Sequence, residues 1–422
     1  MALLTRFVYK STVLLATLFI LISPTAAQQM AVNPKAAGMS KERLARLDAF
    51  LDKEITAGNI PGAVSMIYRK GQLAHYNAQG FSNLSTKDKM QLDEIFYIQS
   101  MTKPIVSVGL MMLYEEGYFE LNDPISKYFP EFKNMQVATF VDGEDSEEKK
   151  MELSQADKPI TIAQCLSHTA GFSHGLGYSE IDQMYLKTLY FQPHKTIKDR
   201  VMAMSKLPLV THPDNVWYYS AAPDVLALLI EHFTGKNCSD FLEERLFGPL
   251  GMDDTGYNLV EAKNDRIVTV HHKGPDGKGA LVPFAQRQPK GQGNTVFGGT
   301  HALFSTAADY LKFCQMLLNN GSFNGKRFLS RKTIELMTTD RVGKKFGAPG
   351  NGFGLGFGIV TDKGSNGALT SEGTYSWSGA FNTYFFIDPK EELIGILMTQ
   401  VDPYTNFYNR KLRQLTYQAI VD

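Results

Sequence analysis

The stretch from Ser100 to Tyr114 constrains the fold more than any other part of the chain. It opens with Ser100-Met101-Thr102-Lys103 and continues as a largely apolar run from Pro104 to Tyr114. Proline is tolerated in the first turn of a helix and disrupts later turns, so a helix should begin close to Pro104. The run therefore predicts a buried helix that ends at Gly117.

Ser100 and Lys103 are three residues apart, so on a helix they lie on one face. A hydroxyl becomes a nucleophile when a neighbour takes its proton, and a lysine that is neutral part of the time can do so. The positive end of a helix and apolar surroundings both lower the pKa of such a lysine. The alternative is a capping serine followed by a surface lysine, because Ser-x-x-Lys is a common pattern.

The first 27 residues have the pattern of an export signal. Arg6 and Lys10 precede an apolar stretch from Val13 to Ile22, and small residues follow at Pro24-Thr25-Ala26-Ala27. The apolar stretch is short for a membrane span, and no cysteine follows it to carry a lipid. We expect cleavage after Ala27, an exported (periplasmic or secreted) protein and no stable membrane insertion; an uncleaved anchor is the alternative.

Charge and cysteine content narrow the function classes. Two of the 43 Lys and Arg residues and none of the 43 Asp and Glu residues lie in the signal, so the mature chain is nearly neutral and no nucleic-acid partner is expected. Cys165, Cys238 and Cys314 fit small buried hydrophobic residues. No Cys-x-x-Cys occurs and His271-His272 lacks a third ligand nearby, so no metal or other cofactor is expected.

The two ends of the chain carry the strand patterns. An amphipathic helix is predicted for Ser40 to Thr56, and a hairpin for Ala63 to Tyr68 and Leu73 to Ala78. We expect both ends to contribute to one antiparallel sheet flanked by N- and C-terminal helices. The C-terminal segments are strands at Gly354 to Val360, Tyr375 to Trp377, Thr383 to Ile387 and Leu393 to Thr399, and a helix at Asn406 to Ile420.

The middle of the chain is predicted to be mostly helical. Helices are expected at Thr161 to Ser167 and Leu226 to Phe233, with a short one opened by Asp123-Pro124. The polar stretch from Asp142 to Lys158 is expected to be a solvated loop, long enough for a role at the substrate rim.

No long Ser, Gly or Pro tract and no internal repeat divides the chain, which indicates one domain at 28–422. Its class is α+β. An α/β lobe of about 35–98 and 295–422 and a helical lobe of about 99–294 are expected to hold the active site between them.

Two further motifs could join Ser100 and Lys103. Tyr219, in Trp217 to Leu226, sits at the mouth of a predicted helix, where its hydroxyl is either a proton relay or the polar tip of a core aromatic. In Ser376 to Ala380, a glycine at a strand edge would let a substrate approach the backbone, so that the next N–H points at a developing oxyanion. A simple bend is the alternative there.

Together the three motifs resemble the serine β-lactamase and penicillin-recognising family, in which Ser-x-x-Lys is a signature. The likeness extends over nearly the whole mature chain and implies the β-lactamase/transpeptidase-like fold. Further stretches that carry it are Leu166-Ser167-His168-Thr169-Ala170-Gly171-Phe172, Phe247 to Met252, Gly298-Gly299 and Leu303 to Thr306.

The resemblance implies a role for each motif. Ser100 would be the acylated nucleophile, Lys103 its base and Tyr219 the group that shares protons with Lys103. The backbone N–H groups of Ser100 and Ala380 would form the oxyanion hole, and Trp377, Ser378 and Gly379 would contact the substrate.

Three neighbouring features have minor implied roles. A Ser-Lys-Tyr set needs no histidine, so His168 is expected to stabilise a loop. Phe172 and the loop from Gly175 to Tyr178 are expected to line the cleft.

Two departures from the class C β-lactamase pattern indicate the substrate. Ala221 stands where Tyr-x-Asn has asparagine, and Trp377-Ser378-Gly379 replaces Lys-Thr-Gly. Both resemble the family VIII carboxylesterases, as does Asp224-Val225-Leu226. We therefore predict a serine hydrolase that cleaves small or short-chain esters through an acyl-enzyme on Ser100. The alternatives are a class C type β-lactamase or D-amino-acid peptidase that acts on an amide, and a penicillin-recognising sensor that acylates without turnover.

Overall fold

The computed structural model describes residues 31–143, 146–274 and 279–422, and residues 32–422 form one compact unit. The expected export signal, Met1 to Ala27, lies outside the described residues. Within the described part, no helix is both long enough and apolar enough to cross a membrane.

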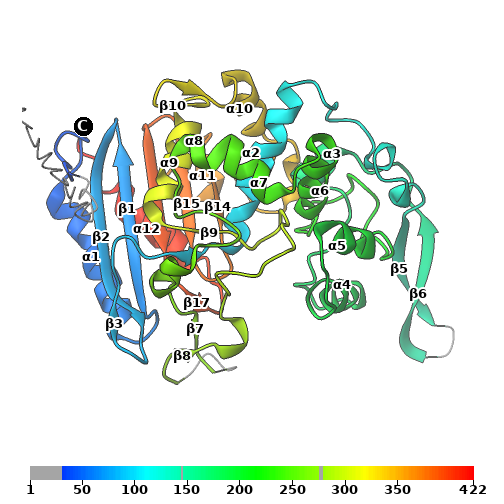
Figure 1. Ribbon diagram of the computed structural model, residues 1–422, viewed down its shortest axis with the longest axis horizontal. Helices are drawn as coiled ribbons and strands as arrows, with labels where there is room; N and C mark the ends of the chain where they lie inside the picture. Colours follow the sequence, from blue (N-terminus) through cyan, green and yellow to red (C-terminus); the bar gives the residue numbers. More distant parts are fainter. Residues whose placement is uncertain (1–30, 144–145, 275–278) are drawn as a thin grey trace, which may run out of the picture. The chain divides into compact units, whose positions relative to one another are not determined.

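An eight-stranded antiparallel sheet frames this unit, with the strand order β12-β13-β14-β15-β16-β1-β2-β3 (Figure 1). Strand β1, Gly62–Arg69, pairs with β2 of its own hairpin and with β16 from the C-terminal part, where Val64 lies opposite Met398. The prediction that both ends of the chain build one antiparallel sheet is confirmed. The other strands are β2 Gln72–Asn83, β3 Asp88–Lys89, β12 Asn351–Phe353, β13 Gly358–Val360, β14 Tyr375–Ser378, β15 Tyr384–Asp388 and β16 Leu393–Met398.

Helices α1, Lys41–Thr56, and α12, Phe407–Tyr417, pack together on one face of the sheet. Helix α1 begins after Ser40, whose hydroxyl accepts the Arg43 N–H at 3.2 Å, as a capping serine does. Residues of β15 alternate between the two faces: Phe386 packs with α1 and α12, and Phe385 belongs to the main core with helix α9, Ala307–Leu318. The predicted terminal helices are confirmed.

The predicted central helix is confirmed as α2, Thr102–Glu115, and twelve of its residues are buried. A 3₁₀ turn, Gln99–Met101, precedes it and holds Ser100. Helix α2 packs against α6, Pro223–Thr234, and α7, Cys238–Leu242. Gly109 permits this contact, because a Cβ there would lie 2.8 Å from a methyl group of Leu242. The core is thus built around the helix that carries Lys103.

The middle of the chain is largely helical, as expected. The predicted helix at Thr161 to Ser167 is α3, and the one at Leu226 to Phe233 is part of α6; Asp123-Pro124 opens a 3₁₀ turn, Ile125–Lys127. The three cysteines are buried and free. The remaining helices are α3 Ile162–Ser167, α4 Glu180–Tyr190, α5 Ile197–Met204, α8 Gly248–Leu250, α10 Arg331–Met337 and α11 Lys363–Asn366.

Short strand pairs connect these elements. β4 Phe96–Tyr97 pairs with β9 Phe304–Ser305, directly before the turn that holds Ser100. The others are β7 His271–His272, β8 Val282–Pro283 and β17 Val401–Asp402 in one sheet, and β10 Ser322–Phe323 with β11 Lys326–Arg327.

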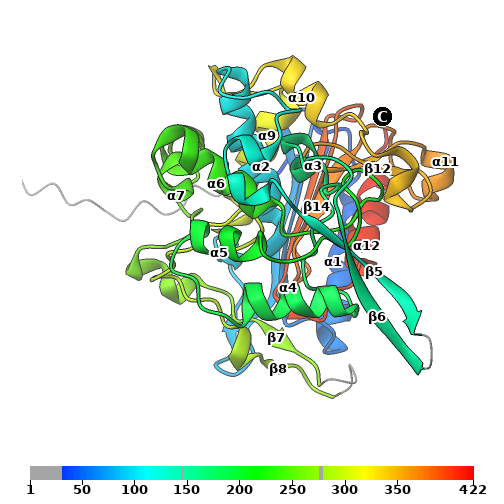
Figure 2. The same cartoon turned by 90° about the vertical axis from the view of Figure 1, so that its right-hand side faces the viewer.

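Two sequence-based predictions about local structure were wrong. The expected loop at Asp142 to Lys158 is mostly strand, since β5 Gln136–Gly143 and β6 Ser146–Gln155 form an antiparallel hairpin that extends away from the other elements (Figure 2). Backbone hydrogen bonds hold such a ladder, so charged side chains do not prevent it. The expected strand from Gly354 to Val360 is instead a turn followed by β13, because Gly356 takes a φ of +97°.

Candidate active site

Ser100 lies in the 3₁₀ turn between β4 and α2, at the surface end of the buried helix. The preceding residue, Gln99, has a φ of +49°, a left-handed conformation that is uncommon for a residue with a side chain. Strained backbone of this kind is typical of functional sites. The turn leaves the Ser100 side chain half-buried, within reach of the buried Lys103.

Lys103 is in direct contact with Ser100. Its Nζ donates to Ser100 Oγ at 3.1 Å and to the Thr300 carbonyl oxygen at 2.8 Å, and only 1% of the residue is exposed. Burial holds the pKa of Lys103 well below its usual value; the Asp224 carboxylate raises this pKa and the Arg200 guanidinium lowers it. A lysine in this position can be a neutral amine and accept a proton.

Tyr219 approaches Ser100 from the other side. Its hydroxyl donates to Ser100 Oγ at 2.6 Å, and its ring lies 4.6 Å from Lys103 Nζ. Burial raises the pKa of Tyr219, so the phenol keeps its proton at neutral pH. Lys103 and Tyr219, which the sequence motifs predicted as neighbours of Ser100, are therefore both within hydrogen-bond reach of Ser100 Oγ.

The end of strand β14 lies against the turn that carries Ser100. A Cβ at Gly379 would lie 2.4 Å from the Ile98 carbonyl oxygen and 2.3 Å from Thr383 Oγ1, so this close approach requires glycine. The Gly379 N–H is taken by the Thr383 carbonyl oxygen at 2.8 Å. The contact places the Gly379-Ala380 peptide next to the Ser100 turn, and the neighbouring Trp377 beside Tyr219.

A cluster of aromatic side chains, the aromatic wall, packs beside Tyr219; it consists of Trp217, Phe346, Phe353 and Trp377. The Trp377 ring lies 5.6 Å from Tyr219 and 5.1 Å from Phe353, measured between ring centroids. Trp217 continues the wall, 4.7 Å from Phe346 and 5.6 Å from Phe353. Sequence reasoning missed Phe346 and Phe353, because they come from the connection before β12 and from β12 itself, outside any of the three motifs.

His168 holds the loop in front of Tyr219. It ends α3 in the left-handed conformation, with a φ of 57°. Its Nδ1 lies 2.9 Å from the Ser220 hydroxyl and accepts the Ser220 N–H at 3.2 Å. Burial keeps the pKa of His168 well below its usual value, so the ring is neutral. This geometry is that of a residue that stabilises a loop.

Phe172 does not line the cleft, and that expectation was wrong. Its side chain is fully buried and packs edge-on against Phe132, with ring centroids 5.8 Å apart. An apolar residue next to a glycine turn is equally compatible with a core position, which is where Phe172 lies. In the loop from Gly175 to Tyr178, the side chain of Tyr178 is 99% exposed.

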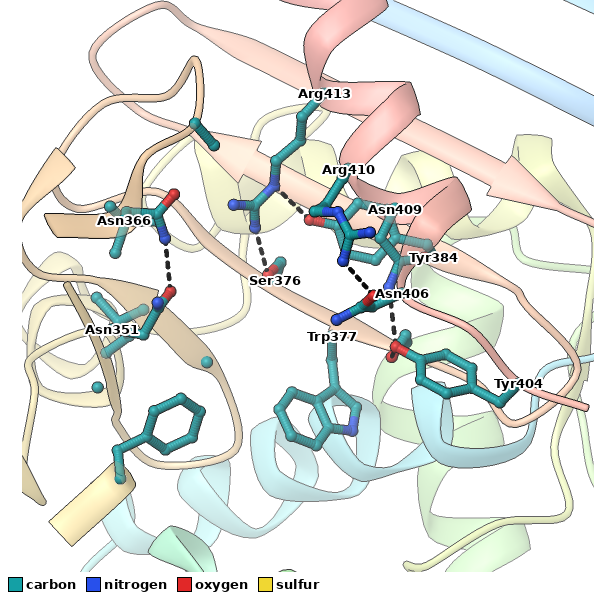
Figure 3. Close-up of a pocket in the computed structure, with 17 residues that line it drawn as sticks. Asn351, Asn366, Ser376, Trp377, Tyr384, Tyr404, Asn406, Asn409, Arg410 and Arg413 are labelled. Carbon is teal, nitrogen blue, oxygen red and sulfur yellow. Dashed lines mark hydrogen bonds between the residues drawn. The ribbon is translucent and has the colours of Figure 1, made fainter. Parts of the chain in front are cut away.

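A pocket of about 380 Å³ opens beside β14 and α12 (Figure 3). Trp377 and Ser378 line it; Ser100, Lys103 and Tyr219 do not. Ser378 Oγ lies 3.0 Å from the Tyr404 hydroxyl. The pocket also contains Arg410 and Arg413 of α12. Sequence reasoning predicted α12 and missed its role here, although the arginines are three apart on one helix face.

The Arg413 side chain is held in this pocket by hydrogen bonds to two neighbouring strands, β14 and β15. Its Nε donates to the Tyr384 hydroxyl at 2.5 Å and its Nη2 to Ser376 Oγ at 2.9 Å. Both partners are hydroxyl groups of β14 and β15, so neither brings a carboxylate to the guanidinium next to the strand that carries Trp377. Among the described residues, no group of three or more His, Cys, Asp or Glu side chains could hold a metal ion.

A serine whose hydroxyl contacts a buried lysine and a tyrosine, set between an antiparallel sheet and a helical region, defines a serine hydrolase. Comparison with known sequences supports this class. The family model described as Beta-lactamase matches residues 47–418. The chain belongs to the β-lactamase family.

Relatives of the chain are similar over most of their length. Protein Rv1367c of Mycobacterium tuberculosis is 32% identical, with 82% of this chain and 87% of that protein covered. Esterase EstB of Burkholderia gladioli is 26% identical, with 87% of this chain and 93% of that protein covered. Among solved structures, EstCE1, described as a hydrolase with promiscuous acyltransferase activity, has a TM-score of 0.76 at 22% identity, covering 89% of this chain and 99% of that chain. The predicted family and fold are confirmed.

Proposed function

We propose that this protein is an exported esterase that cleaves small or short-chain esters through an acyl-enzyme on Ser100. One observation carries the proposal: Lys103 Nζ and Tyr219 Oη lie 3.1 Å and 2.6 Å from the same oxygen, Ser100 Oγ. A hydroxyl with a potential base on one side and a phenol on the other has the partners that nucleophilic catalysis requires.

In the proposed reaction, neutral Lys103 takes the proton of Ser100 as Oγ attacks the carbonyl carbon of the ester. The backbone N–H groups of Ser100 and Ala380 stabilise the oxyanion that forms. Tyr219 passes a proton to the departing alcohol and is reprotonated from Lys103. Water then attacks the acyl group on Ser100, the same groups return the protons, and the free acid leaves.

The aromatic wall supports neutral ester substrates. Trp377 offers an apolar face and no charge, its indole N–H being buried, and Ala221 lacks the amide that asparagine would provide there. The Burkholderia gladioli relative is named an esterase, which agrees with this substrate class. An activity panel tests the proposal: purified mature protein with p-nitrophenyl esters of graded chain length, nitrocefin and D-alanyl peptides. We expect clear turnover of the short esters, and a burst that stops after one equivalent of product would instead mean a sensor.

Trp377→Lys should move the specificity towards β-lactams. A lysine supplies a cation for the carboxylate of a penicillin, and a charge-assisted contact of this kind contributes about 1.5 to 3 kcal/mol. We expect the ratio of kcat/KM for penicillin to kcat/KM for the best ester to rise by up to about 10- to 100-fold. Trp377→Met, which removes the indole without adding a charge, is the control and should leave β-lactam hydrolysis weak.

Penicillin hydrolysis by the wild type at a rate comparable to its best ester would contradict this assignment. The guanidinium groups of Arg410 and Arg413 in the neighbouring pocket would then have replaced the missing lysine. Such a result would favour the class C β-lactamase alternative.

Export gives a separate prediction. The small residues at Thr25-Ala26-Ala27 form a cleavage site, so the mature protein should begin near Gln28 and be found outside the cytoplasm. N-terminal sequencing of the exported protein measures this directly. Recovery of an intact Met1 in the membrane fraction would show an anchor instead.

A further inference from the structure

Lys103 is held by a chain of hydrogen bonds that begins well away from Ser100. The Thr300 carbonyl oxygen accepts Lys103 Nζ at 2.8 Å, and the Thr300 N–H donates to Asp224 Oδ1 at 2.9 Å. The second oxygen of Asp224 accepts Arg200 Nε at 2.7 Å. All four residues are buried, with at most 5% exposed. The ion pair of Arg200 and Asp224 is therefore connected to Lys103 through the backbone of a single residue, Thr300.

The Gly298-Gly299 motif makes this chain of contacts possible. A Cβ at Gly298 would lie 2.6 Å from Asp224 Oδ1, and one at Gly299 would lie 2.0 Å from the Pro223 carbonyl oxygen. Side chains at either position would push the segment of residues 298–300 away from the start of α6. The Tyr257 hydroxyl holds the same segment by donating to the Gly298 carbonyl oxygen at 2.7 Å. The two glycines thus let Asp224 reach the Thr300 N–H.

We infer that Asp224 and Arg200 are positioning residues for Lys103, because they fix the Thr300 carbonyl that orients its amine. A neutral amine has two N–H bonds and one lone pair. With one N–H held by Thr300, rotation about the Cε–Nζ bond is restricted. In the neutral amine the lone pair can then be kept towards Ser100 Oγ, where the protonated amine donates an N–H. This inference rests on the proposed role of Lys103 as the base; neither Asp224 nor Arg200 contacts the reacting atoms.

The ion pair also sets the charge that Lys103 experiences. Asp224 raises the pKa of Lys103 and Arg200 lowers it by less, so the two act in opposite directions. The other titratable groups close to Lys103 are Tyr219 and three histidines. All three histidines have pKa values lowered mainly by burial, that of His301 to about 4, and are neutral near pH 7. The histidines are His168, His174 and His301.

Asp224→Asn tests the inference. Asparagine has one acceptor oxygen, so it cannot accept from both the Thr300 N–H and Arg200 Nε. The ion pair breaks, and Arg200 no longer holds the side chain in the position from which it fixes Thr300. With a short p-nitrophenyl ester, we expect kcat to fall by about 10²-fold, as for a small misplacement of a catalytic group, with KM within about twofold. Arg200 is then uncompensated, so the pKa of Lys103 falls and the acidic limb of the pH profile of kcat/KM moves to lower pH.

Gly298→Ala provides a second variant that changes no charge. Its methyl group would press on Asp224 Oδ1, so we expect kcat to fall without any shift of the acidic limb. The inference is overturned if Asp224→Asn leaves both kcat and the acidic limb of the pH profile unchanged. If Asp224→Asn does not fold, the inference is overturned by a folded Gly298→Ala with unchanged kcat.

The matched control is Glu391→Gln/Asp422→Asn, which deprives another buried arginine, Arg69, of both its carboxylates. Arg69 is the last residue of β1 and lies opposite Leu393 of β16, at the other end of the strand from Val64. The control should lower the melting temperature and leave kcat and the pH profile unchanged. Equal loss of kcat in the control would mean that destabilisation alone explains Asp224→Asn, and would also overturn the inference. Lys103→Ala with full activity would instead contradict the proposed function itself.

Discussion

Ser100→Ala is expected to abolish ester turnover, and Lys103→Ala to lower kcat nearly as far. The two residues act on one proton, so the loss of either removes the activated nucleophile and the effects do not add in the double variant. The structure supplies the reason: Lys103, buried in the first turn of α2, has its Nζ 3.1 Å from Oγ of the half-buried Ser100. The measurement is kcat with the best p-nitrophenyl ester for both single variants and the double variant.

Mass spectrometry after treatment with a phosphonate should place the adduct on Ser100. Ser107 is a buried serine of α2 that follows Lys103 in the helix. Ser107→Ala is the control for Ser100→Ala. It should be labelled and turn over like the wild type. A phosphonate adduct on any other serine would contradict the mechanism.

The pH dependence follows from the same contact. Lys103 must be neutral to accept the proton, so activity should be lost as the pH falls through the pKa of Lys103. Burial lowers that pKa from its usual value, which moves the loss of activity to a lower pH than an exposed lysine would give. A rate that stays constant down to the pH at which carboxylates become protonated would exclude Lys103 as the base.

The sequence predicted those elements whose structure is determined by residues close together in the chain. The apolar run after Lys103 can only be buried, and α2 is buried almost throughout. The hairpin predicted for Ala63 to Tyr68 and Leu73 to Ala78 appears as β1 and β2. The three motifs were also informative together, because their order in the chain implied a fold that brings Ser100, Lys103 and Tyr219 to one place.

The features that sequence reasoning missed depend on contacts between distant segments. Asp224 was noticed only as part of a motif, and its link to Thr300 spans 76 residues. The charged β5–β6 hairpin was predicted to be a loop because charge was taken as a sign of irregular structure. Arg413 belongs to a predicted helix, but its partners Tyr384 and Ser376 lie on two strands that only the folded sheet brings next to it.

The glycines illustrate the same limit. Gly298, Gly299 and Gly379 each stand where a Cβ would collide with a neighbouring segment. From the sequence, each could be a turn or a bulge. In the structure, each allows one segment of the site to approach another, which is a property of the packing and not of the local chain.

Tyr219→Phe is expected to lower kcat by about 10²-fold or more and to leave the fold intact. The hydroxyl lies 2.6 Å from Ser100 Oγ, and burial raises its pKa. It therefore keeps its proton at neutral pH and can act as a proton donor. The ring would keep its packing without the hydroxyl: it stacks on His174 at 5.0 Å with an interplanar angle of 13°. The loss should therefore appear in kcat, with little change in KM or melting temperature.

The neighbouring residue offers a matched control. Tyr218 also has a hydrogen-bonded hydroxyl, which is partly buried, but it donates to the Asp182 carboxylate at 2.9 Å and makes no contact with Ser100. Tyr218→Phe removes the same atom one residue away, so it should lower stability slightly and leave kcat unchanged. If the two variants behave alike, with turnover near that of the wild type, Tyr219 is a core aromatic and the proton must reach the leaving alcohol from Lys103. A deficit confined to Tyr219→Phe would separate proton transfer from packing, because the two variants differ only in where the lost hydroxyl pointed.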